Sequence, residues 1–309
     1  MAYEAVPADR GEEPLLLGLI GPPGGGKTLS ALKLAKGIQS VRGGDIIVLD
    51  SEGGRSKKYN DQIPFKIVEL PTTARSDVFL EAIKAQLAAK PAAIVVDSMS
   101  DEHEAYLAWH DEQVPNMGGN EWAAWAKPAA ARKKLVSGIL KIKVPLIFTF
   151  RAKEKTKQDG RKVVNIGWQP VAPLEIVHTL DLACLLPPRA EGMPVWKSDK
   201  IGEDFVLKLP NYLAPFIQAG EPLSEQMGAA FARWAKGENA PAGSIVPTAE
   251  QYVNQWDGII RESTDATKLH TRWTLDKKLR GQITWPDDGT FDGLFARVKT
   301  AIEALKVPA

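Results

Sequence analysis

Apolar residues along this chain gather in short runs that alternate with longer segments of helical spacing. The clearest runs cover residues 15–20, 45–50, 92–97 and 144–150, and each is bounded by glycine, proline or polar residues. Runs of this length are typical of strands buried on both faces of a parallel sheet. Their alternation with helices predicts an α/β fold with a doubly wound, mostly parallel sheet and right-handed crossovers. Weaker patterns predict further strands at residues 65–70, 179–186, 194–197 and 204–209.

Helical periodicity fills the segments between these strands and continues past them. We expect helices over residues 28–37, 76–90, 101–113, 121–141 and 224–236. A stretch rich in glycine, alanine and proline at residues 237–247 is typical of a flexible linker. Three amphipathic patterns within residues 248–309 then predict a small helical domain. The predicted organisation is a flexible N-terminus at 1–13, an α/β domain at 14–236, the linker, and the helical domain.

Composition narrows the function classes without choosing among them. The chain has 309 residues, of which 44% are hydrophobic and 25% charged, and its formal net charge is +1. Any affinity for nucleic acid must therefore come from local patches and not from a global field. The single cysteine, Cys184, lies in an apolar run and is expected to be a buried, unreactive thiol. No apolar run approaches the ~20 residues that cross a bilayer, so we expect a cytoplasmic protein with no membrane partner.

The first apolar run leads directly into a glycine-rich motif of the form GxxxxGKT. A strand, such a loop and a helix in this order form a phosphate-binding loop, in which backbone N–H groups surround phosphates at a helix N-terminus. Lys27 is expected to reach the β- and γ-phosphates, and the Thr28 hydroxyl to ligate Mg²⁺. The sequence therefore predicts ATP and Mg²⁺ as cofactors. The expected nucleotide-binding residues are Gly21, Pro22, Pro23, Gly24, Gly25, Gly26, Lys27, Thr28 and Leu29.

Acidic residues follow two of the other predicted strands. Asp97 ends one run in the pattern of a Walker B strand, where it would hold Mg²⁺ together with Thr28. Its alternative role is to cap the next helix. Glu52 is the best-placed carboxylate to hold the attacking water in line. Asp50 stays an alternative for that role, because side chains alternate along a strand and Asp50 and Glu52 share a face.

The order of these motifs resembles the core of the RecA family of recombination ATPases. The resemblance covers residues 14–236 and rests on the phosphate-binding loop, on Glu52, and on the strands that end at Asp97 and Arg151. More closely, the chain is similar to phage-encoded, RecA-like ATPases associated with single-strand annealing. This resemblance implies a RecA-like P-loop domain that hydrolyses ATP, assembles as a ring or filament, and uses Glu52 to orient water. Arg151 stands where the family usually has an amide side chain that senses the γ-phosphate.

A second cation commonly comes from the adjacent subunit in RecA-like assemblies. Residues 196–200, with the sequence WKSDK, follow a Gly-Met-Pro turn and resemble the lysine-bearing motif through which neighbours touch the nucleotide. Lys200 or Lys197 would supply that cation. The alternative interpretation is a solvated polar hairpin.

Two segments match the DNA-facing loops of RecA, namely residues 113–122 and 152–168. The second segment combines cationic side chains with a tryptophan, a mixture that neutralises phosphates and stacks bases without reading sequence. The alternative is a solvated lysine-rich loop. Trp122 and Trp125, at three-residue spacing, are expected to pack within a helix. The expected DNA-binding residues are Lys153, Lys155, Lys157, Arg161, Lys162 and Trp168.

Three functions are compatible with these sequence features. The leading one is an oligomeric, Mg²⁺-dependent ATPase that binds single-stranded DNA and promotes annealing or recombination in the cytoplasm, that of the host bacterium if the gene is carried by a phage. The helical domain would then recruit a single-strand-binding or other replication or recombination protein. The first alternative is a nucleotide-dependent switch with slow hydrolysis. The second is a small-molecule kinase, but its arginine-rich lid is missing, since residues 153–162 hold only Arg161.

Overall fold

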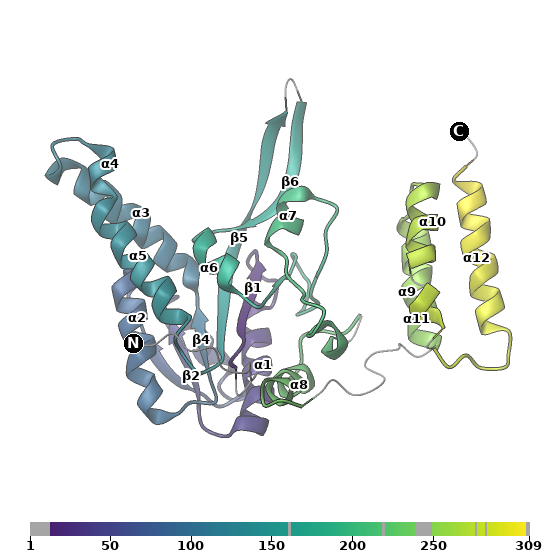
Figure 1. Ribbon diagram of the computed structural model, residues 1–309, viewed down its shortest axis with the longest axis horizontal. Helices are drawn as coiled ribbons and strands as arrows, with labels where there is room; N and C mark the ends of the chain where they lie inside the picture. Colours follow the sequence, from purple (N-terminus) through teal and green to yellow (C-terminus); the bar gives the residue numbers. More distant parts are fainter. Residues whose placement is uncertain are drawn as a thin grey trace, which may run out of the picture. The chain divides into compact units, whose positions relative to one another are not determined.

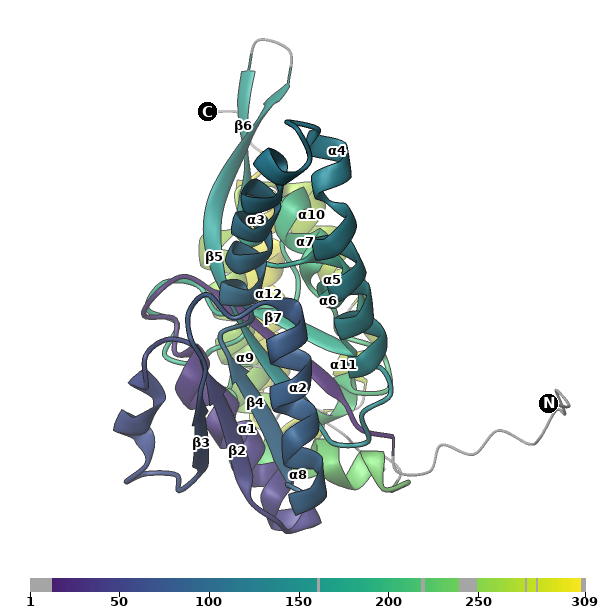
Figure 2. The same cartoon turned by 90° about the vertical axis from the view of Figure 1, so that its left-hand side faces the viewer.

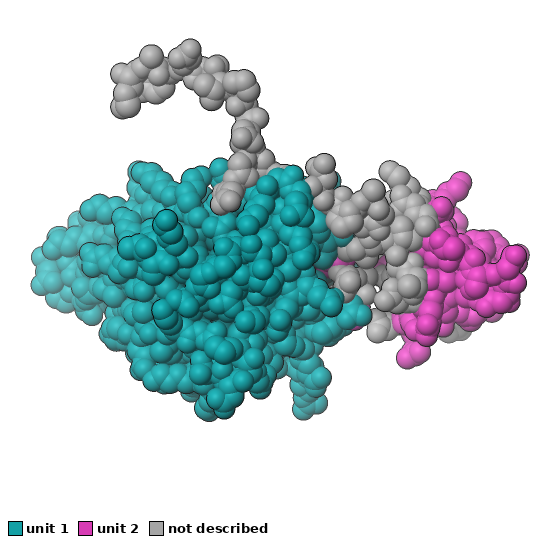
Figure 3. Space-filling view, turned by 90° about the horizontal axis from the view of Figure 1, so that it is seen from below, with its two compact units in different colours: residues 1–216, 221–240 teal, residues 217–220, 241–309 magenta. Residues whose placement is uncertain are grey.

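Two compact units make up the chain in the computed structural model (Figure 3). The structure describes residues 13–159, 162–217, 220–238, 249–275, 277–281 and 283–306. The first unit comprises Met1–Phe216 and Glu221–Ala240, and the second comprises Ile217–Gly220 and Pro241–Ala309. The predicted N-terminal segment, except residue 13, and the predicted linker, except residues 237 and 238, lie outside the described residues.

The first unit is built on one seven-stranded sheet of order β3-β2-β4-β5-β1-β7, with β6 paired to β5. All pairings along this path are parallel, and only β5 and β6 pair antiparallel. The predicted doubly wound α/β fold is therefore confirmed. The strands are β1 Leu16–Gly21, β2 Ile46–Asp50, β3 Lys66–Glu69, β4 Ala93–Asp97, β5 Leu146–Asp159, β6 Lys162–Pro170 and β7 Leu182–Leu185.

Helices cover both faces of this sheet (Figures 1 and 2). Helix α1 (Lys27–Arg42) packs on one face beside α8 (Glu225–Ala235). The other face carries α2 (Ser76–Gln86), α3 (Met99–Asn116) and α5 (Ala126–Ile139), whose buried side chains join one apolar core with the strands. The shorter elements are α4 Glu121–Ala124, α6 Leu174–Thr179, α7 Ile201–Val206 and the 3₁₀ turns Arg55–Tyr59, Leu87–Ala89 and Ala214–Phe216.

Strand alternation explains why the central strands read as continuous apolar runs. In β4, Ile94 and Val96 join the core beneath α2 and α5, while Val95 points to the opposite face and is also fully buried. Cys184 in β7 is buried, as predicted, and burial raises the pKa of its thiol.

The predicted strand that ends at Arg151 is instead the first half of a longer strand. Strand β5 continues to Asp159 and pairs with β6, so the two form a hairpin that projects beyond the sheet (Figures 1 and 2). The sequence pattern missed this extension because residues 153–158 are polar and exposed on both faces. They remain extended through the backbone ladder to β6, which leaves no hydrophobic alternation to detect.

Two predicted late strands are wrong. Residues 194–197 and 204–209 contribute only single bridges, Leu185 with Val195 and Ala183 with Lys208. The first half of the second segment, residues 204–206, belongs to helix α7. Its Glu203 carboxylate is buried and accepts hydrogen bonds from the Trp168 backbone N–H and the Ser198 hydroxyl. These tertiary contacts override the local strand preference.

The second unit contains the three predicted amphipathic helices and one further turn of helix. Its core includes Trp256 and Trp273, whose rings meet edge to face with centroids 4.8 Å apart. Within the described part of the chain, no helix is both long and apolar enough to cross a membrane. The helices are α9 Ala249–Glu262, α10 Ala266–Leu275, α11 Lys277–Arg280 and α12 Thr290–Ala304.

Glycines set the close contact between α1 and α8. A Cβ atom at Gly37 would lie 1.9 Å from the Glu225 carbonyl oxygen, and one at Gly228 would lie 2.1 Å from the Leu34 carbonyl oxygen. Both neighbours are backbone atoms, so a methyl group at either position would force the helices apart. This contact holds the helix that follows the phosphate-binding loop.

We expect Gly37→Ala to lower the free energy of unfolding of the first unit by about 1–3 kcal/mol, the usual cost of overpacking. Chemical denaturation would measure it. The matched control is Gly258→Ala in α9, where no atom lies within 4 Å of the added Cβ. That change should leave the second unit equally stable or more stable, because alanine favours helix by about 1 kcal/mol over glycine. A stable Gly37→Ala protein would show that the two helices can separate at little cost.

Candidate nucleotide-binding site

The carboxyl ends of four parallel strands meet at one edge of the sheet. In the strand register, Asp50 of β2 lies beside Asp97 of β4, and Gly21 of β1 lies beside Arg151 of β5. A cleft of about 580 Å³ opens at this edge. The predicted site residues that line it are Pro23, Gly24, Gly26, Lys27, Thr28, Glu52, Asp97 and Arg151, whereas Gly21, Pro22, Gly25 and Leu29 do not line it.

The glycines of the phosphate-binding loop meet two different requirements. Gly24 and Gly26 have φ of 80° and 87°, in the left-handed region that the sequence motif predicts. Gly21 and Gly25 are needed for close approach, because a Cβ at either would lie 2.3 or 2.5 Å from the Leu186 carbonyl oxygen. The loop is thus packed against the segment that follows β7, in addition to facing the cleft.

A hydroxyl and a carboxylate meet where the sequence predicts a magnesium site. The Thr28 hydroxyl donates a hydrogen bond to Asp97 Oδ2 at 2.8 Å, and the Thr149 hydroxyl donates to the other oxygen of the same carboxylate. Burial raises the pKa of Asp97, and the two hydroxyls oppose that shift. Among the described residues, no cluster of three or more acidic, histidine or cysteine side chains could hold a metal. The pair fits Mg²⁺, which takes few protein ligands and completes its shell with water and phosphate.

Asp50 and Glu52 have different surroundings. The Asp50 carboxylate is fully buried and accepts hydrogen bonds from the backbone N–H groups of Glu52, Gly54 and Ser56 at 2.9, 3.0 and 3.1 Å, and from the Ser56 hydroxyl. The Asp50 carboxylate is therefore fully engaged in hydrogen bonds within the loop. The Glu52 side chain instead lines the cleft.

Electrostatics also distinguish Glu52. Burial raises the pKa of its carboxyl group, the nearby carboxylates of Asp97 and Asp101 raise it further, and Arg151 and Lys27 oppose the shift. A carboxyl group with a raised pKa in a cleft is a typical general base. Burial lowers the pKa of Lys27, and the Asp97 and Glu52 charges oppose that change.

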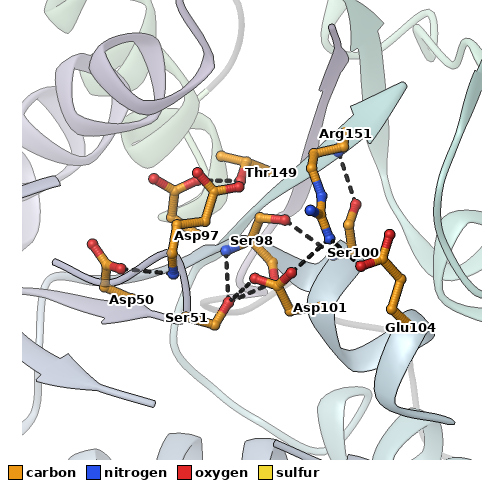
Figure 4. Close-up of polar contacts among 10 residues, drawn as sticks. Asp50, Ser51, Asp97, Ser98, Ser100, Asp101, Glu104, Thr149 and Arg151 are labelled. Carbon is orange, nitrogen blue, oxygen red and sulfur yellow. Dashed lines mark hydrogen bonds and ion pairs between the residues drawn. The ribbon is translucent and has the colours of Figure 1, made fainter. Parts of the chain in front are cut away.

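Arg151 is held by a polar network that the sequence did not show (Figure 4). Its guanidinium forms ion pairs with Asp101 at 2.6 Å and Glu104 at 3.0 Å, both from α3. The Asp101 carboxylate also accepts a hydrogen bond from the Ser51 hydroxyl at 2.7 Å. Arg151 therefore lines the cleft while its charge is shared with two carboxylates.

Six further lining residues were not predicted as site residues, namely Ser51, Gly53, Arg55, Tyr59, Thr72 and Asp101. Asp101 lies in the first turn of α3, directly after the strand that ends at Asp97, so its position next to a strand end was a usable signal. Arg55 and Tyr59 lie on the 3₁₀ turn after β2. The local sequence pattern does not indicate that these two residues line a cleft. Their position depends on the hydrogen bonds by which Asp50 holds the preceding loop.

Lys200 is not one of the described residues that line this cleft. It precedes α7, and its ammonium lies 3.6 Å from Glu203 and 4.0 Å from Glu154, so it sits near the foot of the β5–β6 hairpin. Lys197 is exposed. The proposed role of either lysine in a neighbouring subunit's site stays a prediction.

The predicted DNA-binding lysines lie on the hairpin. Lys153, Lys155 and Lys157 alternate along β5, share one face of the ribbon and are exposed. Trp168 pairs across the ribbon with Glu154, so it faces the opposite side and packs against the core of the sheet. The structure thus separates the tryptophan from the lysines. Arg161 lies outside the described residues, and Lys162 begins β6.

The two neighbouring tryptophans differ from the prediction that both pack. Trp125 does pack, since its ring stacks on His110 with centroids 3.8 Å apart. Trp122 is 89% exposed, so its predicted packing is wrong. The helical periodicity breaks between them, because α4 ends at Ala124 and α5 begins at Ala126.

Comparisons with known proteins assign the chain to a family. No curated protein matches the chain. Among solved structures, the KaiC-like protein PH0186 from the hyperthermophilic archaeon Pyrococcus horikoshii OT3 matches 57% of this chain and 72% of its own, with 19% identity and a TM-score of 0.35. A family model described as AAA domain matches residues 13–182. Because this match spans more than half of the sequence, the chain belongs to the AAA-domain family of P-loop ATPases.

Proposed function

We propose that this protein is a Mg²⁺-dependent ATPase that binds single-stranded DNA and promotes annealing or homologous recombination as an oligomer. One observation carries the proposal. Strand β5 bears Arg151 at the nucleotide cleft and continues without interruption into the exposed lysines of the projecting hairpin. A single strand therefore joins the candidate nucleotide cleft to a cationic surface suited to phosphates.

Hydrolysis of ATP in this cleft depends on positioning and on charge compensation. The Lys27 ammonium, which here donates to the Pro22 carbonyl at 2.9 Å, would turn to the β- and γ-phosphates. Thr28 and Asp97 would hold Mg²⁺, which neutralises charge on the phosphates. The Glu52 carboxylate lines the cleft and accepts no hydrogen bond from the described residues of its own loop. It would accept a proton from the attacking water.

The hairpin supports non-specific binding to single strands. Its three exposed lysines can neutralise backbone phosphates, and Trp122 in α4 offers an exposed ring on which a base can stack. The oligomer would complete each site with Lys200 of a neighbour, and the helical unit would dock a single-strand-binding or other replication or recombination protein.

The first test is ATP turnover with and without single-stranded DNA. Strong stimulation supports the proposal. Slow turnover indifferent to DNA would indicate a nucleotide-dependent switch, and a requirement for a small acceptor would indicate a kinase.

Glu52→Gln should keep Mg²⁺-ATP binding and lower turnover by roughly two to four orders of magnitude, the scale of a lost general base. Calorimetric titration and a phosphate-release assay would measure the two effects. The comparison variant is Asp50→Asn, which removes an acceptor from the loop that positions Glu52 and should therefore lower stability, by about 1–3 kcal/mol, and turnover together. If Asp50→Asn kept full stability and lost turnover while Glu52→Gln kept its turnover, Asp50 would be the base.

If Glu52 is the general base, its pKa determines how kcat/KM depends on pH on the acid side. Because its surroundings raise the pKa of Glu52, the base becomes ionised only above the ordinary value of 4.5, and kcat/KM should rise as pH passes through that raised pKa. Glu52→Gln should lack this rise. An identical acid limb in the variant would assign the titration to another group.

Changing Lys153, Lys155 and Lys157 together to Ala should weaken binding of single-stranded DNA and leave basal ATPase activity intact. Log K falls with log salt by about 0.7 per phosphate neutralised on single strands, so the salt slope should flatten by roughly two. A matched triple change at Lys84, Lys134 and Lys141, which are exposed on or beside α2 and α5, removes the same charge away from the hairpin. An equal effect in both triple variants would place the DNA elsewhere.

Mixing Lys200→Ala with an excess of Glu52→Gln protein tests assembly. Some interfaces then pair an intact Glu52 with an intact Lys200, so two nearly inactive proteins should recover part of the activity. Specific activity of the parent should also rise with protein concentration and saturate. Absence of recovery, together with concentration-independent turnover, would exclude a cation supplied by a neighbour.

A further inference from the structure

Three cations line the nucleotide cleft, and they differ in how their charge is used. Lys27 belongs to the phosphate-binding loop and Arg151 is engaged by Asp101 and Glu104. The third is Arg55, whose exposed side chain forms no ion pair or hydrogen bond with any other residue that the structure describes. Its neighbour Lys57, by contrast, is paired with Glu69.

The backbone that carries Arg55 is fixed. Asp50 accepts the N–H groups on both sides of it, from Gly54 and Ser56, and Gly53 and Gly54 both have φ of 74°. With the Ser56 hydroxyl turned inward to Asp50, the Arg55 side chain is left to face the cleft. A ligand that binds Arg55 therefore has to order only a side chain, which keeps the entropic cost of binding low.

The charge balance of the cleft favours an anion at Arg55. Its lining contains three carboxylates, Glu52, Asp97 and Asp101, and three cations. Because Asp101 and Glu104 already compensate Arg151, a bound triphosphate needs positive charge from elsewhere. A guanidinium stays ionised at all working pH values, loses little hydration at an exposed position, and binds phosphate oxygens in a bidentate manner.

We propose that Arg55 contacts the γ-phosphate of the bound nucleotide and so makes the site prefer a nucleoside triphosphate over a diphosphate. The γ-phosphate is favoured over the inner phosphates because Arg55 shares its short loop with Glu52, which faces the attacked phosphorus in the proposed reaction. The inference rests on the proposed ATPase function.

The experiment is calorimetric titration of the full chain with Mg²⁺-ADP and with a non-hydrolysable Mg²⁺-ATP analogue. For Arg55→Ala we expect affinity for the ATP analogue to fall roughly ten-fold and affinity for ADP to change less than two-fold, the scale of one charge-assisted hydrogen bond. Arg55→Lys keeps the charge and loses the bidentate geometry, so its affinity for the ATP analogue should lie between those of the parent and Arg55→Ala. The matched control, Lys58→Ala, removes an exposed cation of the same 3₁₀ turn that does not line the cleft, and should change neither affinity.

An equal loss for both nucleotides would overturn the inference, because the guanidinium would then contact the base, the ribose or the inner phosphates. Unchanged affinities for both would overturn it too. A parent protein that binds neither nucleotide would overturn the proposed function and this inference together, whereas a parent that binds both leaves the function standing whatever Arg55 does. Equal melting temperatures for Arg55→Ala and the parent are expected from the exposure of Arg55.

Discussion

The buried carboxylate of Asp50 is the constraint on which the nucleotide site depends. A fully buried charge is tolerated only when hydrogen bonds replace its hydration, and Asp50 obtains four donors from the loop that follows its own strand. Meeting this requirement folds residues 52–56 back onto the strand end. As a result Glu52 and Arg55 line the cleft, so a structural carboxylate positions the two side chains to which we assign roles in the proposed reaction.

The continuity of β5 gives this fold a direct connection between two surfaces. Its first half is a central strand, buried between β1 and β4, and its second half is an exposed ribbon. Arg151 stands at the change between the two, where α3 holds it through Asp101 and Glu104. A phosphate that contacts Arg151 in the proposed reaction would compete with these two carboxylates for its charge.

The sequence predicted the parts of the fold that buried side chains determine. Central strands such as β4 are apolar on both faces, and the phosphate-binding loop follows one of them, so the sheet and the cleft were predictable. The hairpin was not, because its polar strands are held by backbone hydrogen bonds, which leave no pattern in side chains. Arg55 was missed for a related reason, since its place in the cleft depends on the contacts of Asp50 and not on its own spacing.

The raised pKa values of three carboxyl groups in the cleft have the same main cause, and a bound cation would oppose all three shifts. Burial is the leading cause at Glu52, Asp97 and Asp101, and neighbouring carboxylates add to it at each of them. Divalent charge next to Asp97 would favour the ionised form of all three groups, and by linkage their ionisation favours binding of that charge. The protein alone thus holds a cleft in which carboxylates are costly to ionise. In the proposed reaction, Mg²⁺ and nucleotide would offset this cost, so ionisation of Glu52 would be linked to binding of the substrate.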